Sequence, residues 1–265
     1  MEYLAIIVIT LLSGVIGTGL GGLIGGILRR ESNKIVSLLL SFAAGIMLAV
    51  VCFDLMSRPI TMMRKGLFPP YTPIIVVISV IFGYCVIYLL NFLIDKFADG
   101  RSVHSDDKNN DRNLLITGLI MMIAIALHNL PEGMVIGASY ALEPDLLANL
   151  FTGSGFIMAI VIGLHNIPEG MAVSVPLISG GMGKIKAVLL TALSGLPTVL
   201  GAILGYALGG INDVMLTLSL GFASGAMLYV VFGELLPESL LMWKSKLPAF
   251  SLFIGLLTGF LLVIF

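Results

Sequence analysis

The sequence predicts an all-α polytopic membrane protein with eight transmembrane helices, arranged as an inverted 3+2+3 repeat around a central pair of metal-binding helices. Hydrophobic residues make up 58% of the chain and charged residues 11%, and the apolar runs reach the roughly 20 residues that a membrane-spanning helix needs. One polar six-residue segment occurs twice inside these runs, at 128–133 and 165–170. The runs that flank this pair resemble each other, which predicts the repeat.

Eight apolar runs are predicted to span the membrane, and together they form a single transmembrane domain of residues 1–265. The predicted spans cover residues 3–28, 35–57, 73–94, 113–141, 151–179, 185–209, 214–237 and 248–265. A long polar segment lies at about 95–113, between the third and fourth spans. The formal net charge of −1 gives no indication of a nucleic-acid partner. The partners we expect at this point are the lipid bilayer and, in a homodimer, a second copy of the chain.

The basic residues predict the orientation of the spans. Four segments hold 11 of the 14 Lys and Arg residues, namely 29–34, 95–113, 180–186 and 242–248. The other three, Arg58, Arg64 and Lys65, lie on the opposite side. Because cytoplasmic loops carry the excess of basic residues, we expect a multi-pass protein of the cell membrane with loop 95–113 in the cytoplasm and both termini outside.

The first span carries small residues at helical spacing, at Gly14, Gly17, Gly21 and Gly25. Such a stripe lets a second helix approach closely, so we expect a packing role for it. A shift of 180 residues aligns part of this stripe with glycines of the sixth span, at Gly201 and Gly205.

The second and seventh spans are related by the same shift of 180 residues. Residues 44–54 then match residues 224–234, with identical residues at Gly45, Met47, Leu48, Val50 and Val51. Asp54 is aligned with Glu234, and we expect both on the ion path because the repeat gives them equivalent positions. The two spans cross the membrane in opposite directions, so the repeat is inverted, as in many transporters that bind their ion near the midplane.

The doubled segment reads His-Asn-Leu-Pro-Glu-Gly at 128–133 and His-Asn-Ile-Pro-Glu-Gly at 165–170. In each copy the His and the Glu are four residues apart, which places them on one face of a helix. Polar residues inside a span are costly and usually functional. Two such helices facing each other supply nitrogen and oxygen ligands that suit Zn²⁺ and also accept Fe²⁺, Mn²⁺ or Co²⁺. The candidate ligands are His128, Asn129, Glu132, His165, Asn166 and Glu169.

A structural alternative is that each His and Glu form a buried hydrogen-bonded pair that locks two helices together. Two copies with the same His, Asn, Pro, Glu and Gly, and no other His in an apolar span, favour the metal site. We therefore predict one coordination shell, formed by His128, Glu132, His165 and Glu169. A Gly follows each Glu, at Gly133 and Gly170, and leaves room for a close neighbouring helix.

These features resemble the ZIP (Zrt-, Irt-like) family of divalent-metal transporters, and most closely its bacterial zinc-uptake branch. The resemblance covers nearly the whole chain: eight spans with external termini, a cytoplasmic loop after the third span, the doubled segment in the fourth and fifth spans, and Glu-Leu-Leu-Pro at 234–237.

The resemblance implies two adjacent metal sites. The first consists of His128, Glu132, His165 and Glu169. The second consists of Asn129 and Asn166 together with the same two Glu residues. In similar bacterial members the sixth span reads Ser-Gly-Leu-Ala-Glu-Pro, and its Glu also binds at the second site. Here residues 194–199 read Ser-Gly-Leu-Pro-Thr-Val, so Thr198 stands in place of that carboxylate.

The main functional hypothesis is transport of a divalent metal ion into the cytoplasm through the site between the fourth and fifth spans. Zinc is the expected ion, with iron, manganese and cadmium as further candidates. The ion is the substrate, and we expect no cofactor and no catalytic residue. One alternative is an intramembrane di-metal enzyme, because carboxylate and His ligands on facing helices also build di-iron oxidases. The other is a metal sensor that binds without transport.

Overall fold

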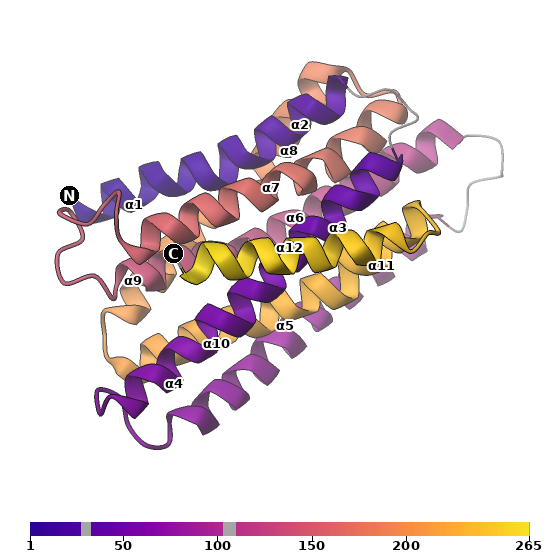
Figure 1. The fold of residues 1–265 in the computed structure, drawn as a ribbon. Coiled ribbons are helices and arrows are strands. Elements are labelled where there is room, and N and C mark those ends of the chain that lie inside the picture. The colour runs from indigo at the N-terminus through magenta and orange to yellow at the C-terminus, as the bar shows by residue number, and fades with distance from the viewer. Residues whose placement is uncertain (28–32, 103–109, 265) are drawn as a thin grey trace.

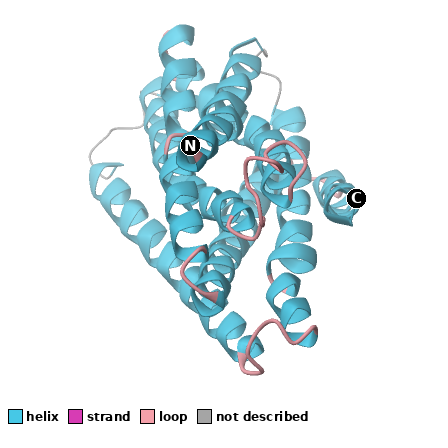
Figure 2. Cartoon of the chain, turned by 90° about the vertical axis from the view of Figure 1, so that its left-hand side faces the viewer, coloured by secondary structure: helices cyan, strands magenta, loops and turns pink. Residues whose placement is uncertain are grey.

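The computed structural model describes residues 1–27, 33–102 and 110–264, and in these parts the chain is built of helices joined by turns and loops (Figure 1, Figure 2). Eight helical spans in these parts are long and apolar enough to cross a membrane, as predicted. They are Glu2–Ile27, Lys34–Arg64, Thr72–Ile94, Leu114–Tyr140, Ser154–Ser179, Lys184–Gly209, Asp213–Met242 and Leu247–Ile264.

Three of the spans contain a π-helical segment between two α-helices. The first three spans comprise α1 (Glu2–Thr10), η1 (Leu11–Ile16) and α2 (Gly17–Ile27); α3 (Asn33–Val50), η2 (Val51–Leu55) and α4 (Ser57–Arg64); and α5 (Thr72–Ser102). The fourth and fifth are the single helices α6 (Asn110–Tyr140) and α7 (Ser154–Ser179). The last three comprise α8 (Lys184–Ser194) and α9 (Pro197–Gly209); α10 (Asp213–Tyr229), η3 (Val230–Leu235) and α11 (Leu236–Met242); and α12 (Leu247–Ile264).

The long polar loop is shorter than predicted, because α5 continues to Ser102 and α6 begins at Asn110. Charged and polar residues can extend a helix beyond the apolar core, where water satisfies their side chains. The remainder of predicted loop 95–113, at 103–109, lies outside the described residues, as does 28–32 with its two arginines. Both termini lie at the same end of the molecule, as an even number of spans requires (Figure 1).

The spans pack in two groups. In the first group, α2 packs against α7 and α8, and α6 packs against α7 and α9. In the second, α3 packs against α11 and α12, and α5 packs against α10. Contacts of α6 with α10 and of α3 with α7 join the two groups. The pair α6 and α7 therefore lies inside the first group and also borders the second.

Glycine allows the closest of these contacts, because in lipid helices associate through packing rather than through the hydrophobic effect. The glycine stripe of the first span has the predicted packing role: Gly17, Gly21 and Gly25 lie against α7, and a Cβ atom on Gly21 would meet the carbonyl of Ile167. A Cβ on Gly133 would meet the carbonyl of Thr198, and one on Gly170 that of Thr18. The Gly after each Glu thus allows a neighbouring helix to pack directly against α6 or α7.

Candidate metal site

Of the six candidate ligands of the doubled segment, the two His and the two Glu side chains come together where α6 packs against α7. His128, Asn129 and Glu132 lie on α6, and His165, Asn166 and Glu169 on α7. None of the six is more than 2% exposed. Polar side chains buried this deeply in a membrane protein require partners, since unsatisfied polar groups cost several kcal/mol, of order 2–7.

Each His faces the Glu of the opposite helix rather than the Glu four residues later on its own helix. Nε2 of His165 lies 3.0 Å from Oε1 of Glu132. Nε2 of His128 lies 3.4 Å from Oε2 of Glu169. The two contacts are equivalent in the two copies of the segment, so the His and Glu side chains form a crossed arrangement between α6 and α7.

The two carboxylates meet at the centre of this arrangement. Ligand atoms of Glu132, His165 and Glu169 all lie within 4.8 Å of one another, a spacing that can hold a metal ion. Two ionised carboxylates at this distance repel each other strongly in a buried site. A cation between them removes that repulsion, and the His128 ring borders the same cluster through Glu169.

Many of the buried ligand atoms have no hydrogen-bond partner among the described residues. These atoms are both ring nitrogens of His128, Nδ1 of His165, Oε2 of Glu132 and both carboxylate oxygens of Glu169. Buried polar groups are nearly always paired, so a concentration of unpaired acceptors is typical of a site that binds a cation. The purely structural alternative accounts for the hydrogen bond between His165 and Glu132 but not for these atoms.

The two Asn side chains have their oxygens available. Asn129 donates from Nδ2 to the carbonyl of Ser194, at 2.9 Å, and Asn166 donates to the carbonyl of Ser13, at 3.3 Å. The Oδ1 atoms of both Asn residues are buried, with no hydrogen-bond partner in the described parts of the chain. Each amide is therefore oriented by a neighbouring helix through its N–H, which leaves a carbonyl oxygen, a hard ligand, available to a cation.

A cavity of about 230 Å³ leads away from His128. Its polar lining consists of Asn91, His128, Tyr229, Glu234 and Glu238, and its apolar lining includes Ile120 on α6. His128 and Ile120 are eight residues apart, which is about 12 Å along a helix. The cavity therefore extends from the site toward the end of the molecule where α6 begins.

Glu234 lies beside the site, whereas its counterpart Asp54 is paired elsewhere. Oε2 of Glu234 is 3.4 Å from Nδ1 of His128. Asp54 instead accepts hydrogen bonds from Nε and Nη2 of Arg58, at 3.0 and 2.6 Å. Arg58 also donates to Ser154 at the start of α7, at 3.2 Å. Asp54 thus belongs to a polar network at the end of the molecule opposite the cavity.

Thr198 is fully buried near the start of α9, and its Oγ1 has no hydrogen-bond partner among the described residues. It packs on the glycine stripe of the first span: a Cβ atom on Gly14 would lie 2.6 Å from Thr198 Oγ1. Position 198 therefore offers a hydroxyl and no carboxylate. The close packing of Thr198 on Gly14 means that a longer side chain at this position would require the surrounding backbone to rearrange.

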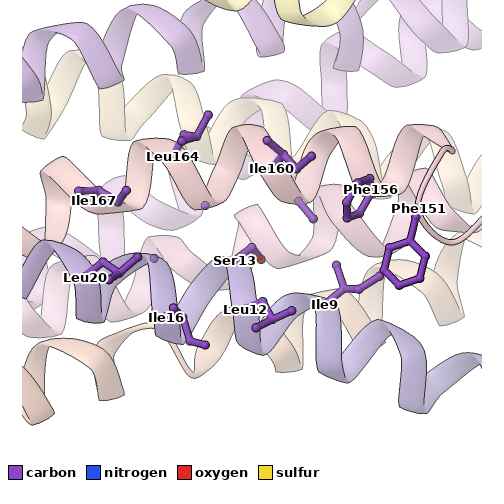
Figure 3. Close-up of a pocket in the computed structure, with 13 residues that line it drawn as sticks. Ile9, Leu12, Ser13, Ile16, Leu20, Phe151, Phe156, Ile160, Leu164 and Ile167 are labelled. Atoms are coloured by element: carbon purple, nitrogen blue, oxygen red, sulfur yellow. The ribbon is translucent and has the colours of Figure 1, made fainter.

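Another cavity, of about 300 Å³, is apolar. It lies between the first span and α7, and Figure 3 shows aliphatic and aromatic side chains from both facing it. Ser13 contributes the polar side chain of its lining, beside residues such as Leu12, Ile160 and Phe156. This lining does not suit a divalent cation, so the candidate ion site is the polar cluster of α6 and α7 with its adjoining cavity.

Two residues near the candidate path were not singled out by the sequence analysis. Asn91 on α5 donates a hydrogen bond to Oε1 of Glu234. Arg58 holds Asp54. The signal for Asn91 was present, because an amide in the apolar run 73–94 is as unusual as the polar residues of the doubled segment. Arg58 carried no such signal, since it lies at the polar end of its span.

Comparison with known proteins shows the family of the chain. Residues 98–265 match the family of ZIP zinc transporters. The chain belongs to the ZIP zinc transporter family. Zinc transporter ZupT of Chlorobium chlorochromatii is 32% identical over 239 residues, which cover 87% of this chain and 86% of the relative. ZupT of Clostridium perfringens is 32% identical over 268 residues, covering 94% and 91%. Zinc transporter GufA of Myxococcus xanthus is 38% identical over 124 residues, or 46% of each chain.

Membership of the ZIP family confirms the predicted resemblance and the prediction that the protein is not an enzyme. ZIP proteins are transporters, so the alternative of an intramembrane di-metal enzyme is set aside. The multi-pass membrane character of the chain follows from its eight candidate spans.

Proposed function

We propose that this ZIP protein transports Zn²⁺ across the cell membrane into the cytoplasm, through the site between α6 and α7. The observation that carries the proposal is the crossed His and Glu cluster with its unpaired, fully buried ligand atoms in the described part of the chain. Two imidazoles and two carboxylates form a donor set that suits zinc. The first metal site consists of His128, Glu132, His165 and Glu169, and Asn129 and Asn166 supply adjacent oxygens.

The direction of transport rests on charge and on the cavity. The loops beside the start of α6 belong to the basic segments, which the positive-inside rule assigns to the cytoplasm. The polar cavity next to His128 extends toward this same end. An ion that leaves His128 along this cavity meets Glu234 and Glu238 before it reaches the cytoplasm. Asp54, at the opposite end, is in this proposal the outer carboxylate of the path.

An inverted repeat of spans one to three and six to eight is supported by equivalent contacts. Under the 180-residue shift, the pairing of α2 with α7 corresponds to that of α9 with α6, and the pairing of α3 with α12 to that of α10 with α5. A Cβ atom on Gly83 would meet the backbone of Phe222, and one on Gly255 would meet the backbone of Phe42. Phe42 and Phe222 are related by the 180-residue shift, whereas the two glycines are 172 residues apart. The π-helical segments η2 and η3 also lie at equivalent positions. Such symmetry allows two related conformations, as alternating access needs.

The same ligands accept other divalent ions. Imidazole and carboxylate bind Fe²⁺ and Mn²⁺ as well as Zn²⁺, and Cd²⁺ has the same charge and accepts nitrogen ligands. We therefore propose zinc as the main substrate, with iron, manganese and cadmium as competing ones.

Zinc uptake into liposomes that contain the purified protein tests this function. We expect Zn²⁺ to enter the vesicles at a rate that depends on the protein and saturates with zinc, reported by an indicator trapped inside. Vesicles with Zn²⁺ bound to the protein but no uptake would contradict transport and would instead identify a metal sensor. Vesicles without protein are the control for leakage.

The presence of Thr198 in place of a carboxylate predicts how many Zn²⁺ ions the protein binds tightly. Two divalent ions that share Glu132 and Glu169 repel each other, and a neutral hydroxyl offsets this less than a third carboxylate would. We expect calorimetric titration of the wild-type protein to show one tightly bound Zn²⁺ per chain, with any second ion much weaker. Two ions of comparable high affinity would contradict this. Titration of the wild type is a cleaner test than Thr198→Glu, because Thr198 packs against Gly14.

A further inference from the structure

We propose that Asn91 is a positioning residue of the metal site, which holds the Glu234 carboxylate so that Glu234 in turn orients the His128 ring toward the metal. The inference rests on the proposed zinc site and adds a function for two residues outside the doubled segment. It connects three helical elements, since Asn91 lies on α5, Glu234 on η3 and His128 on α6.

Asn91 is a buried amide within the apolar part of α5. It is 6% exposed, and its Nδ2 donates to Oε1 of Glu234. Burial of an amide at this position costs free energy unless the amide makes a hydrogen bond. The partner here is a carboxylate, and a hydrogen bond to a charged acceptor is stronger than one between neutral groups.

Glu234 uses its two oxygens on different neighbours. Oε1 accepts from Asn91, and Oε2 lies 3.4 Å from Nδ1 of His128. The other ring nitrogen of His128, Nε2, lies 3.4 Å from Oε2 of Glu169. The imidazole therefore stands between Glu234 and the carboxylate cluster, with one nitrogen turned to each.

This order of groups is that of a metal-binding His with an outer carboxylate. A His that ligates a metal through one nitrogen usually donates the other N–H to a carboxylate or carbonyl, which fixes the tautomer and the ring orientation. Glu234 is placed to accept from Nδ1–H, so that the lone pair of Nε2 points to the metal. Asn91 limits the rotation of Glu234 and keeps its second oxygen available for His128.

The second His of the site lacks this support within the described residues. In the described parts of the chain neither His makes a hydrogen bond through Nδ1, but Nδ1 of His128 lies 3.4 Å from the Glu234 carboxylate, whereas the carboxylate contact of His165 is made by Nε2. The counterpart of Glu234 in the repeat, Asp54, is paired with Arg58. Glu234, held by Asn91, is therefore an outer carboxylate for His128, and the two halves of the site are unequal.

The test compares Zn²⁺ affinity in the full-length protein carrying Asn91→Ala, Glu234→Gln or both substitutions. Glu234→Gln keeps the shape but replaces one acceptor oxygen by an amide, and we expect it to raise the Kd for Zn²⁺ about 10–100-fold, the usual effect of losing an outer-shell partner. Asn91→Ala should raise Kd by a smaller factor in the wild type and by no further factor in the Glu234→Gln background, because it acts through Glu234. Cys85→Ala, at an exposed position of α5, should leave Kd unchanged.

The visible absorption of bound Co²⁺ distinguishes positioning from ligation. We expect the Glu234→Gln and Asn91→Ala proteins, saturated with Co²⁺, to keep the wild-type spectrum, because the ligands themselves are unchanged. A changed spectrum in Glu234→Gln would make Glu234 a ligand, and equal effects of Asn91→Ala in both backgrounds, or none in the wild type, would also overturn the proposal. If alanine prevents folding, Asn91→Leu, which has a similar size and shape but neither an N–H donor nor a charge, gives the same comparison. Failure of the wild-type protein to bind Zn²⁺ would instead reject the metal site itself.

Discussion

Zinc uptake is expected to fall to the level of protein-free vesicles when Glu132 or Glu169 is replaced by Gln. Each substitution keeps the size of the side chain and removes one negative charge from a fully buried cluster. A divalent cation is stable in a low-dielectric site only when charged ligands compensate for its lost hydration. With one carboxylate left, the site retains half of the compensating charge, so both binding and transport should be lost.

The matched control for these variants is Glu2→Gln. Glu2 is an exposed carboxylate whose Oε2 accepts a hydrogen bond from Tyr206, at 2.7 Å and far from the doubled segment in the sequence. Loss of the Glu2 charge should leave the rate of zinc uptake close to that of the wild type. Comparable amounts of each protein in the vesicles, measured by blotting, separate loss of transport from loss of folding. Normal uptake by both site variants would refute the role of the two Glu residues.

The sequence was sufficient to predict the spans, because lipid imposes a strong requirement for apolar runs. The boundaries differ most where helices continue past the apolar part. The second span was predicted to end at 57 and ends at Arg64, and the seventh was predicted to end at 237 and ends at Met242. In both cases a short helix that includes charged or polar residues, α4 or α11, follows the π-helical segment. Hydropathy detects the bilayer core and not the last helical turns outside it.

The site was predicted only in part. The doubled segment identified the two His and two Glu residues that lie together, since polar side chains repeated inside apolar helices are costly and usually functional. The crossed pairing of each His with the Glu of the opposite helix was not predicted, because spacing along one helix carries no information about its neighbour. The contact of Glu234 with His128, and the pairing of Asp54 with Arg58, depend likewise on how the chain packs in space.

The second large effect is expected from the two His residues. Substitution of both His128 and His165 by Ala removes the nitrogen ligands and leaves the carboxylates and amides. We expect Zn²⁺ affinity to fall by at least the roughly 10–100-fold that results from loss of an outer-shell partner alone, because direct ligands contribute more. Each single variant, His128→Ala or His165→Ala, lacks one of the two imidazole ligands. Substitution of the remaining His104, which lies in the polar segment 95–113, is the control and should have no effect.

X-ray absorption at the zinc edge of the loaded wild-type protein tests the central claim most directly, because it reports which atoms surround the ion. The account predicts nitrogen and oxygen neighbours at about 2.0–2.2 Å, with the multiple scattering of two imidazole rings and no sulfur. The imidazole signal should be halved in either His variant and absent in the double variant. A wild-type spectrum without imidazole scattering, or one that keeps it in the double variant, would contradict a zinc site formed by His128 and His165 with Glu132 and Glu169.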